Sequence, residues 1–402
     1  MARFAVLLLL ALAAGCHKDR LAPTVAHAPP RLPAGPRGTV SPDVSAVSDR
    51  PAAAEPARPS EYRHLTAAEC RTLAVLHAPL ADDLDNHPDN EPPPHPHFHA
   101  RRSEFAHQSR LARGYAADEL RSRAAADALE LYWKLAAAEG QFDLLVASHA
   151  LLRTQLAAAE KAVKAGLADG TEADRLRRQL LDVESQVAKL EAALAVLNAG
   201  LGGQIGLDPA DPLPLWPADP LRVGGDDPDV GHAVETARQY RPDLNLLRVL
   251  TASEDFGGEL ARAVLTSVNP LLATQDATNP VVAMLAVLKK EPTKAEAKLH
   301  RQLVALLATR ERQAEAEVRA AAATLRGDRS AVAAKAAEIR NLSAKVADLE
   351  KRVAAGVAGA EALLVVARLD QLKLRGELIQ LAAEWHIAEV KFRQATGMLV
   401  RE

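Results

Sequence analysis

The amino-acid sequence predicts an all-α fold of long antiparallel helical hairpins, internally duplicated, with little or no β-structure. Three observations support this prediction. Apolar residues follow a heptad spacing along four long segments, a glycine-centred turn separates the segments of each pair, and the whole arrangement occurs twice. Alanine and leucine dominate the composition and aromatic residues make up only 3%. This composition favours closely packed helices over sheets.

The first hairpin is centred on Gly166. Before this glycine, apolar or small residues step by four and three, with only His149 breaking the alternation: Leu131, Leu135, Ala138, Phe142, Leu145, Leu152, Leu156, Ala159 and Val163. After the turn the stepping resumes at Leu176, Leu180, Val183, Val187, Leu190, Leu194, Leu197 and Leu201. This spacing is typical of a coiled-coil seam. We therefore expect the chain to fold back on itself here.

The second hairpin, centred on Gly356, repeats the first. Its seam residues are Ile339, Leu342, Val346, Leu349 and Val353 before the turn, and Leu374, Leu378, Leu381, Trp385, Ala388 and Phe392 after it. The returning arms reach Gly206 and Gly397 at nearly the same distance from their turns. A duplication is the simplest explanation. Arms of this length, at 1.5 Å per residue, would each extend roughly 60 Å.

The N-terminal residues 1–15 are interpreted as a lipoprotein signal peptide. A positive start precedes the apolar run from Phe4 to Ala14, which is too short to span a bilayer. Small residues lead directly to Cys16, as in a bacterial lipobox, so Cys16 is the candidate lipidation site. The alternative is an ordinary secretory signal with an incidental cysteine. His17 rather than aspartate follows the cysteine, which favours the outer membrane.

Residues 16–60 are rich in Pro and Ala without periodicity, the composition of a disordered tether. Residues 61–102 contain a short helix and a linker rich in Pro and His. Thr66 and Glu69 have the spacing of a capping box at the start of that helix. In the linker, His95, His97 and His99 alternate and could bind a transition metal. The alternative, a solvated polyproline segment without ligand role, is preferred because nothing fixes the imidazoles.

The remaining segments are the first hairpin repeat, 103–206, a connecting segment with short helices, 207–292, and the second hairpin repeat, 293–402. Thr171 and Asp174 again have capping-box spacing at the start of the returning arm. Tyr132 and Trp133 are interpreted as packing residues inside the first repeat. Proline after arginine in the run Arg241 to Leu244 marks the start of a helix between the repeats.

Composition and motifs argue against several functions. The net charge is −3 with both signs interspersed, so no basic face for nucleic acid is expected. Cys70 is the only cysteine besides Cys16, which excludes an internal disulfide if Cys16 is acylated. No clustered nucleophile, base and oxyanion arrangement is present, so we expect neither an enzyme nor a cofactor.

In the order of these elements the chain resembles the TolC-type outer-membrane efflux proteins. The resemblance rests on the two tips (Gly166 and Leu167, Gly356 and Val357), the arm ends at Gly206 and Gly397, and the run from Arg241 to Leu244 between the repeats. It implies a protomer of a homotrimeric coiled-coil α-barrel. It also implies that Gly166, Leu167, Gly356 and Val357 contact a periplasmic adaptor, also called a membrane fusion protein.

Members of that family also insert a β-hairpin into each repeat, which supplies strands of a membrane barrel. A membrane strand needs about 10 residues of alternating polarity with flanking aromatics. The segments between and before the repeats lack this pattern. We therefore expect a divergent member without those strands.

Two functional hypotheses remain. The first is a periplasmic and outer-membrane component of a tripartite efflux system, lipid-anchored at the periplasmic face of the outer membrane, with an adaptor and an inner-membrane pump as partners. The second is a non-transporting periplasmic coiled-coil lipoprotein that acts as a structural or protein-interaction scaffold.

Overall fold

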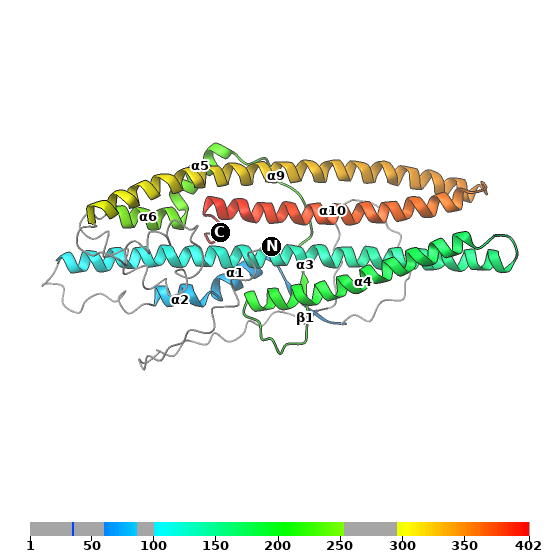
Figure 1. Ribbon diagram of the computed structural model, residues 1–402, viewed down its shortest axis with the longest axis horizontal. Coiled ribbons are helices and arrows are strands. Elements are labelled where there is room, and N and C mark those ends of the chain that lie inside the picture. The colour runs from blue at the N-terminus through cyan, green and yellow to red at the C-terminus, as the bar shows by residue number, and fades with distance from the viewer. Residues whose placement is uncertain (1–33, 36–59, 87–99, 253–295, 402) are drawn as a thin grey trace.

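Four long helices lie side by side and make up most of the computed structural model, which describes residues 34–35, 60–86, 100–252 and 296–401 (Figure 1). They are α3 (Ala100–Lys164), α4 (Thr171–Gln204), α9 (Glu296–Ala354) and α10 (Ala360–Thr396). Helix α3 packs against α4, α9 packs against α10, and α3 packs against α10. The layer order is therefore α9, α10, α3, α4, and the predicted all-α fold is confirmed.

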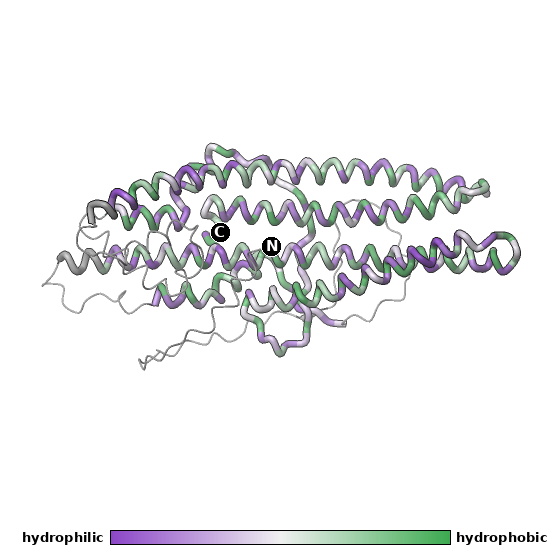
Figure 2. The backbone as a smooth tube through the Cα atoms, in the orientation of Figure 1, coloured by the Kyte–Doolittle hydropathy of each residue, from purple (hydrophilic) through white to green (hydrophobic). Residues whose placement is uncertain are grey.

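The heptad positions explain why these segments are helical and paired. Hydrophobic and hydrophilic residues alternate along all four helices (Figure 2). In the first hairpin, Leu135, Phe142 and Leu201 are buried, as are Ile339 and Leu378 in the second. Each buried side chain removes apolar surface from water at about 25 cal/mol per Å². The seams identified in the sequence are thus the contacts that hold each hairpin together.

Two pairs of short helices precede the long ones. Helices α1 (Ala67–Leu76) and α2 (Pro79–Asp85) pack against α3, while α5 (Val230–Tyr240) and α6 (Pro242–Ala252) pack against α9. The second helix of each pair begins with proline, whose fixed φ suits the first helical turn. The duplication therefore covers two short helices and one long hairpin in each repeat. The heptad spacing of the long segments does not predict this extension of the repeat.

The two predicted capping boxes have different outcomes. The box at α1 is confirmed, because the Glu69 backbone N–H donates to Thr66 Oγ1 at 3.2 Å and the Thr66 N–H donates to Glu69 Oε2 at 2.8 Å. The box at Thr171 is wrong. Gly170, with φ of +88°, is the N-cap of α4, and Thr171 is the first helical residue. Its N–H donates instead to Asp169 Oδ1 at 3.0 Å.

A small sheet lies beside α3. Strand β1 (Ala34–Gly35) runs antiparallel to β2 (Tyr62–Leu65), which runs parallel to β3 (Leu215–Pro217). These strands have two to four residues each, which agrees with the expectation of little β-structure. They attach the start of the described chain to the segment that leaves α4.

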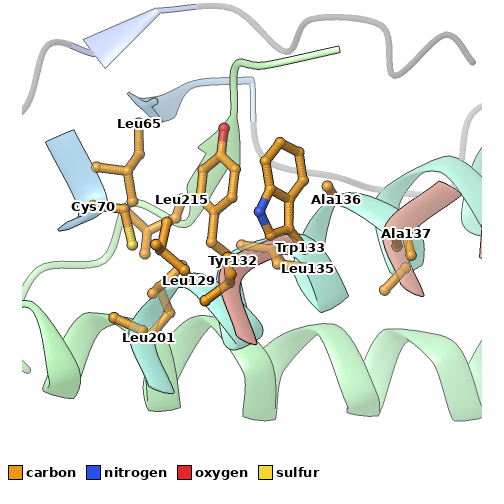
Figure 3. Close-up of a cluster of buried hydrophobic side chains, with 14 of the residues drawn as sticks. Leu65, Cys70, Leu129, Tyr132, Trp133, Leu135, Ala136, Ala137, Leu201 and Leu215 are labelled. Carbon is orange, nitrogen blue, oxygen red and sulfur yellow. The ribbon is translucent and has the colours of Figure 1, made fainter. Parts of the chain in front are cut away.

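The main core lies where the sheet, α1, α3 and α4 meet (Figure 3). Tyr132 and Trp133 are buried there, which confirms their predicted packing role. The Tyr132 hydroxyl donates to Asp219 Oδ2 at 2.6 Å, and burial raises the pKa of this hydroxyl. Burial, followed by the charge of Asp219, raises the pKa of the Cys70 thiol to about 12. Cys70 is therefore an unreactive packing residue.

The two repeats meet along α3 and α10. The Trp133 ring of α3 stacks on the His386 ring of α10, with centroids 3.8 Å apart and planes 9° from parallel. The Gln141 side chain also donates to Gln380 Oε1 at 3.2 Å. These contacts make the two hairpins one continuous layer.

Several predictions concern parts of the chain outside the described residues: the signal peptide, Cys16, the histidines His95, His97 and His99, and the segments 87–99 and 253–295 considered for membrane strands. Within the described helices, none combines the length and the apolar character needed to cross a membrane.

Candidate functional site: the paired tips and the joints behind them

The first tip is the turn from α3 to α4, and its backbone closes α3 with a Schellman motif. The Gly166 N–H donates to the Val163 carbonyl at 3.0 Å, and the Leu167 N–H donates to the Ala162 carbonyl at 2.9 Å. Gly166 has φ of +69°, a left-handed conformation that costs a residue with a Cβ about 1–2 kcal/mol. The glycine therefore allows the sharp stop that exposes the next residue.

The second tip, from α9 to α10, has the same geometry. The Gly356 N–H donates to the Val353 carbonyl at 2.9 Å, and the Val357 N–H donates to the Arg352 carbonyl at 3.0 Å. Gly356 has φ of +71°. The residue after each glycine is thus presented by the same hydrogen-bonded turn, as expected for duplicated elements.

Both tips lie at the same end of the molecule (Figure 1). There the apolar side chains of Leu167 and Val357 are 82% and 51% exposed. A single exposed apolar residue is common on any surface. Two at equivalent positions of neighbouring turns, at the free end of a long layer, form an apolar pair that a partner protein can cover.

An ion pair crosses each hairpin just behind its tip. Arg177 contacts Glu160 at 2.9 Å in the first hairpin, and Arg368 contacts Glu350 at 2.9 Å in the second. Each glutamate lies at the same position before its turn glycine. Because these pairs are exposed, they add little stability. One ion pair therefore lies behind each of the two apolar tip residues.

A groove separates the two hairpins behind the tips. Its volume is about 560 Å³, and small residues of α3 and apolar residues of α10 line its floor: Ala158, Ala159, Ala162, Val365, Val366 and Leu369. Glu172 and Arg175, which pair at 2.5 Å, lie at its rim. The hydrogen bond from Arg175 lowers the pKa of Glu172. A second groove of about 820 Å³ continues along α3 and α10.

The joint between the repeats is built around Arg241, at the corner between α5 and α6. Its guanidinium donates to both oxygens of Asp243, at 3.0 and 2.9 Å, and to Glu317 Oε2 at 2.6 Å. It also donates to the Ala395 carbonyl at 3.2 Å, near the end of α10. Arg310 donates to Asp243 at 2.7 Å and to Glu317 at 2.6 Å. This joint connects α6, α9 and α10.

The protonation states follow from these contacts. Burial opposes ionisation of Asp243, but the hydrogen bonds and charges of Arg241 and Arg310 outweigh it and hold the pKa of Asp243 below its usual value. Burial likewise opposes the charge of Arg241. The hydrogen bonds and charges of Asp243 and Glu317 outweigh burial and raise the pKa of Arg241. All four side chains are therefore charged at neutral pH.

A glycine of positive φ ends each returning arm against the short helices. A Cβ on Gly206 would lie 2.6 Å from the His77 ring at the end of α1, and a Cβ on Gly397 would lie 2.8 Å from the backbone of Tyr240 and Arg241. In each repeat a proline follows the contacted residues in the sequence: Pro79 comes shortly after His77, and Pro242 comes directly after Arg241. The repeated proline was the available sequence signal for this equivalence.

The predicted tip residues Gly166, Leu167, Gly356 and Val357 thus belong to two turns of the same geometry at one end of the molecule. Among the described residues, no group of three His, Cys, Asp or Glu side chains is placed to hold a metal ion. The features found in the described part of the chain are the two apolar tips, the grooves between the hairpins and the joints at the ends of the returning arms.

Comparison with known proteins identifies the fold. No family model matches the sequence, and no curated protein matches it. The solved structure of the outer membrane protein VceC from Vibrio cholerae aligns with 74% of this chain and 75% of its own, at 12% identity and a TM-score of 0.51.

Two further solved structures match similarly. The CmeC outer membrane channel of Campylobacter jejuni aligns with 74% of this chain and 67% of its own, at 11% identity and a TM-score of 0.55. The MtrE outer membrane channel of Neisseria gonorrhoeae in its open state aligns with 74% of this chain and 71% of its own, at 17% identity and a TM-score of 0.52. At such low identity the likeness concerns the fold. This chain therefore has the fold of bacterial outer-membrane channel proteins of the TolC type.

Proposed function

We propose that this chain is the channel component of a tripartite efflux system, in which three copies form a helical tunnel. The observation that carries the proposal is the layer of four long helices with both tips free at one end (Figure 1). Its likeness to solved outer membrane channels supports the same function. The role is conduction, without catalysis or a cofactor.

A layer of this kind favours assembly into a tube. Helices α4 and α9 are its two edges, because among the long helices each contacts only one other extensively. A rotational arrangement of copies joins one edge to the other and closes the layer without leaving a free edge. The enclosed space then serves as the passage. Acyl chains on Cys16 would hold the tube at the periplasmic face of the outer membrane.

The tips are the surface proposed for a periplasmic adaptor, through which the tube meets an inner-membrane pump. Leu167 and Val357 supply exposed apolar side chains on rigid, hydrogen-bonded turns. Rigid presentation reduces the entropy lost on binding. The helix hairpins behind them position both turns at one end, so an adaptor can contact both repeats.

The double variant Leu167→Asp, Val357→Asp is expected to abolish export while leaving the fold intact. Each carboxylate would have to be buried unpaired in an apolar contact, which costs more than the roughly 1–3 kcal/mol of an uncharged polar group, so binding weakens by at least about 10-fold per site. The measurement is retention of a fluorescent pump substrate in cells that rely on this chain as their only channel, with thermal unfolding of the purified variant.

The matched control is Leu80→Asp on α2, a position 47% exposed and remote from the tips. It should export like the unmodified protein. Export that is unchanged in the double tip variant would exclude the tips as the adaptor contact.

A further inference from the structure

The middle of α4, residues 177–193, contains no buried side chain, and no longer stretch of this kind exists in the described parts of the four long helices. Its seam residues Leu180 and Val183 are only half-buried. Buried residues hold both ends of the stretch: Leu176, 4% exposed, toward the tip, and Leu194, 6% exposed, toward the main core. Helix α4 is therefore fixed to α3 on either side of a loosely packed section.

A polar pair interrupts the seam in this section. His149 occupies a heptad position of α3 at which the rest of the seam has apolar or small residues, and its Nε2 lies 3.2 Å from Glu184 Oε1 of α4. The two side chains are 31% and 49% exposed, so water reaches this part of the seam. A polar group at a seam position lowers the stability of a coiled coil, and an ion pair as exposed as this one adds little.

The second hairpin has apolar residues at the same level of its seam. Ile339 of α9 and Leu374 of α10 lie at the corresponding distances from their turn. Ile339 is fully buried, although α9 is an edge helix of the layer just as α4 is. One turn away, the Gln371 side chain donates to Ser343 Oγ at 2.8 Å, and Gln371 is buried. The position of α4 at the edge therefore does not explain its loose section, whereas the polar pair in its seam does.

The larger groove runs along this section. Its volume is about 820 Å³, its wall on α4 consists of Gln179, Asp182, Val183 and Gln186, and the rest is formed mainly by α3 and α10. Regions with few buried apolar contacts open locally at a small fraction of the free energy of global unfolding. Outward movement of the section would widen this groove without exposing the buried residues at either end.

We propose that residues 177–193 of α4 form a movable wall section, which separates from α3 between its two buried ends while the rest of the layer stays packed. The pair of His149 and Glu184 sets how readily it separates. The separation itself is a property of the single chain. Its role rests on the proposed function: in a tube, the movable wall sections let the passage adjust to the size of the solute.

Amide hydrogen exchange of the full chain in detergent at neutral pH tests the separation. Amides of the movable wall section are expected to exchange at least tenfold faster than those of residues 331–347 on α9, the other edge helix. The double variant His149→Ile, Glu184→Leu gives the first seam the residue types of the second. It should slow exchange of the section at least fivefold, because an apolar pair can replace an ion pair without leaving a charge unpaired. Exchange of residues 331–347 should not change.

The control variant is Arg153→Gln, which neutralises an exposed charge one turn from His149 on α3. It should leave exchange of the movable wall section as it is in the unmodified protein. Equal exchange of residues 177–193 and 331–347 in the unmodified chain would overturn the proposal. So would unchanged exchange of the section in the double variant, because the polar pair would then not control the separation.

Export of two solutes of different size tests the role. The probes are a fluorescent dye and a larger conjugate of the same dye, in cells that rely on this chain as their only channel. The double variant His149→Ile, Glu184→Leu should lower export of the conjugate at least threefold more than export of the dye. An equal effect on both would overturn the adjustable passage. If the unmodified chain exports neither probe, the proposed function fails, whereas hydrogen exchange still decides whether the section separates.

Discussion

Replacing Gly397 with alanine is expected to destabilise the fold by about 2–5 kcal/mol. This glycine has φ of +74° at the end of α10, and a Cβ there would lie 2.8 Å from backbone atoms of Tyr240 and Arg241. A left-handed conformation costs about 1–2 kcal/mol for a residue with a Cβ, and overpacking adds roughly 1–3 kcal/mol. Since the clashing atoms are backbone, no side chain can move aside to relieve it. Urea unfolding followed by circular dichroism measures the effect.

Gly356→Ala is the matched control for this substitution. Gly356 has nearly the same φ, +71°, but a Cβ there would meet nothing within 4 Å. It should therefore show only the conformational cost of about 1–2 kcal/mol. Equal destabilisation of the two variants would mean that α10 does not end against the α5–α6 corner in the way described.

Arg241→Met is expected to destabilise the fold by about 3 kcal/mol. The substitution keeps most of the side-chain volume but removes the charge that satisfies Asp243, Glu317 and the Ala395 carbonyl. Breaking a buried ion pair typically costs 3–5 kcal/mol. We expect the lower end of this range because Arg310 still contacts both Asp243 and Glu317 in the variant. Arg319→Met, which removes an exposed pair with Glu315 on the same helix, is the control and should change stability by under about 0.5 kcal/mol.

The pH dependence of stability gives a second test of Arg241. Folding lowers the pKa values of Asp243 and Glu317, so their contribution is present above the ordinary carboxyl pKa near 4 and is lost as the pH falls below it. In Arg241→Met these pKa values rise toward the ordinary value. The loss of stability between about pH 6 and pH 3 should therefore be smaller than in the unmodified protein. An unchanged slope would contradict the assignment of these contacts.

The long hairpins were predictable because their signals are local. Heptad spacing identifies a helix and its buried face, and a glycine after the last seam residue identifies the turn, as at Gly166 and Gly356. Both properties depend only on residues close in the sequence. Even so, local rules gave a wrong cap at Thr171, since the turn places Gly170 in the N-cap position.

The joints could not be predicted because they depend on tertiary contacts. Only the packing of α1 and α2 on α3 shows that the helix beginning at Pro79 is the counterpart of α6. The contact of Gly206 with His77 joins residues far apart in the chain. The strands β1 to β3 are too short to give an alternating pattern.

The most direct test of the tunnel is the native mass of the detergent-extracted protein, together with low-resolution electron microscopy of the same sample. Helix α3 has 65 residues, so it extends about 100 Å at 1.5 Å per residue. The account predicts a mass of three copies and a hollow tube of about that length with threefold symmetry. A monomeric mass, or a particle without a central channel, would contradict it.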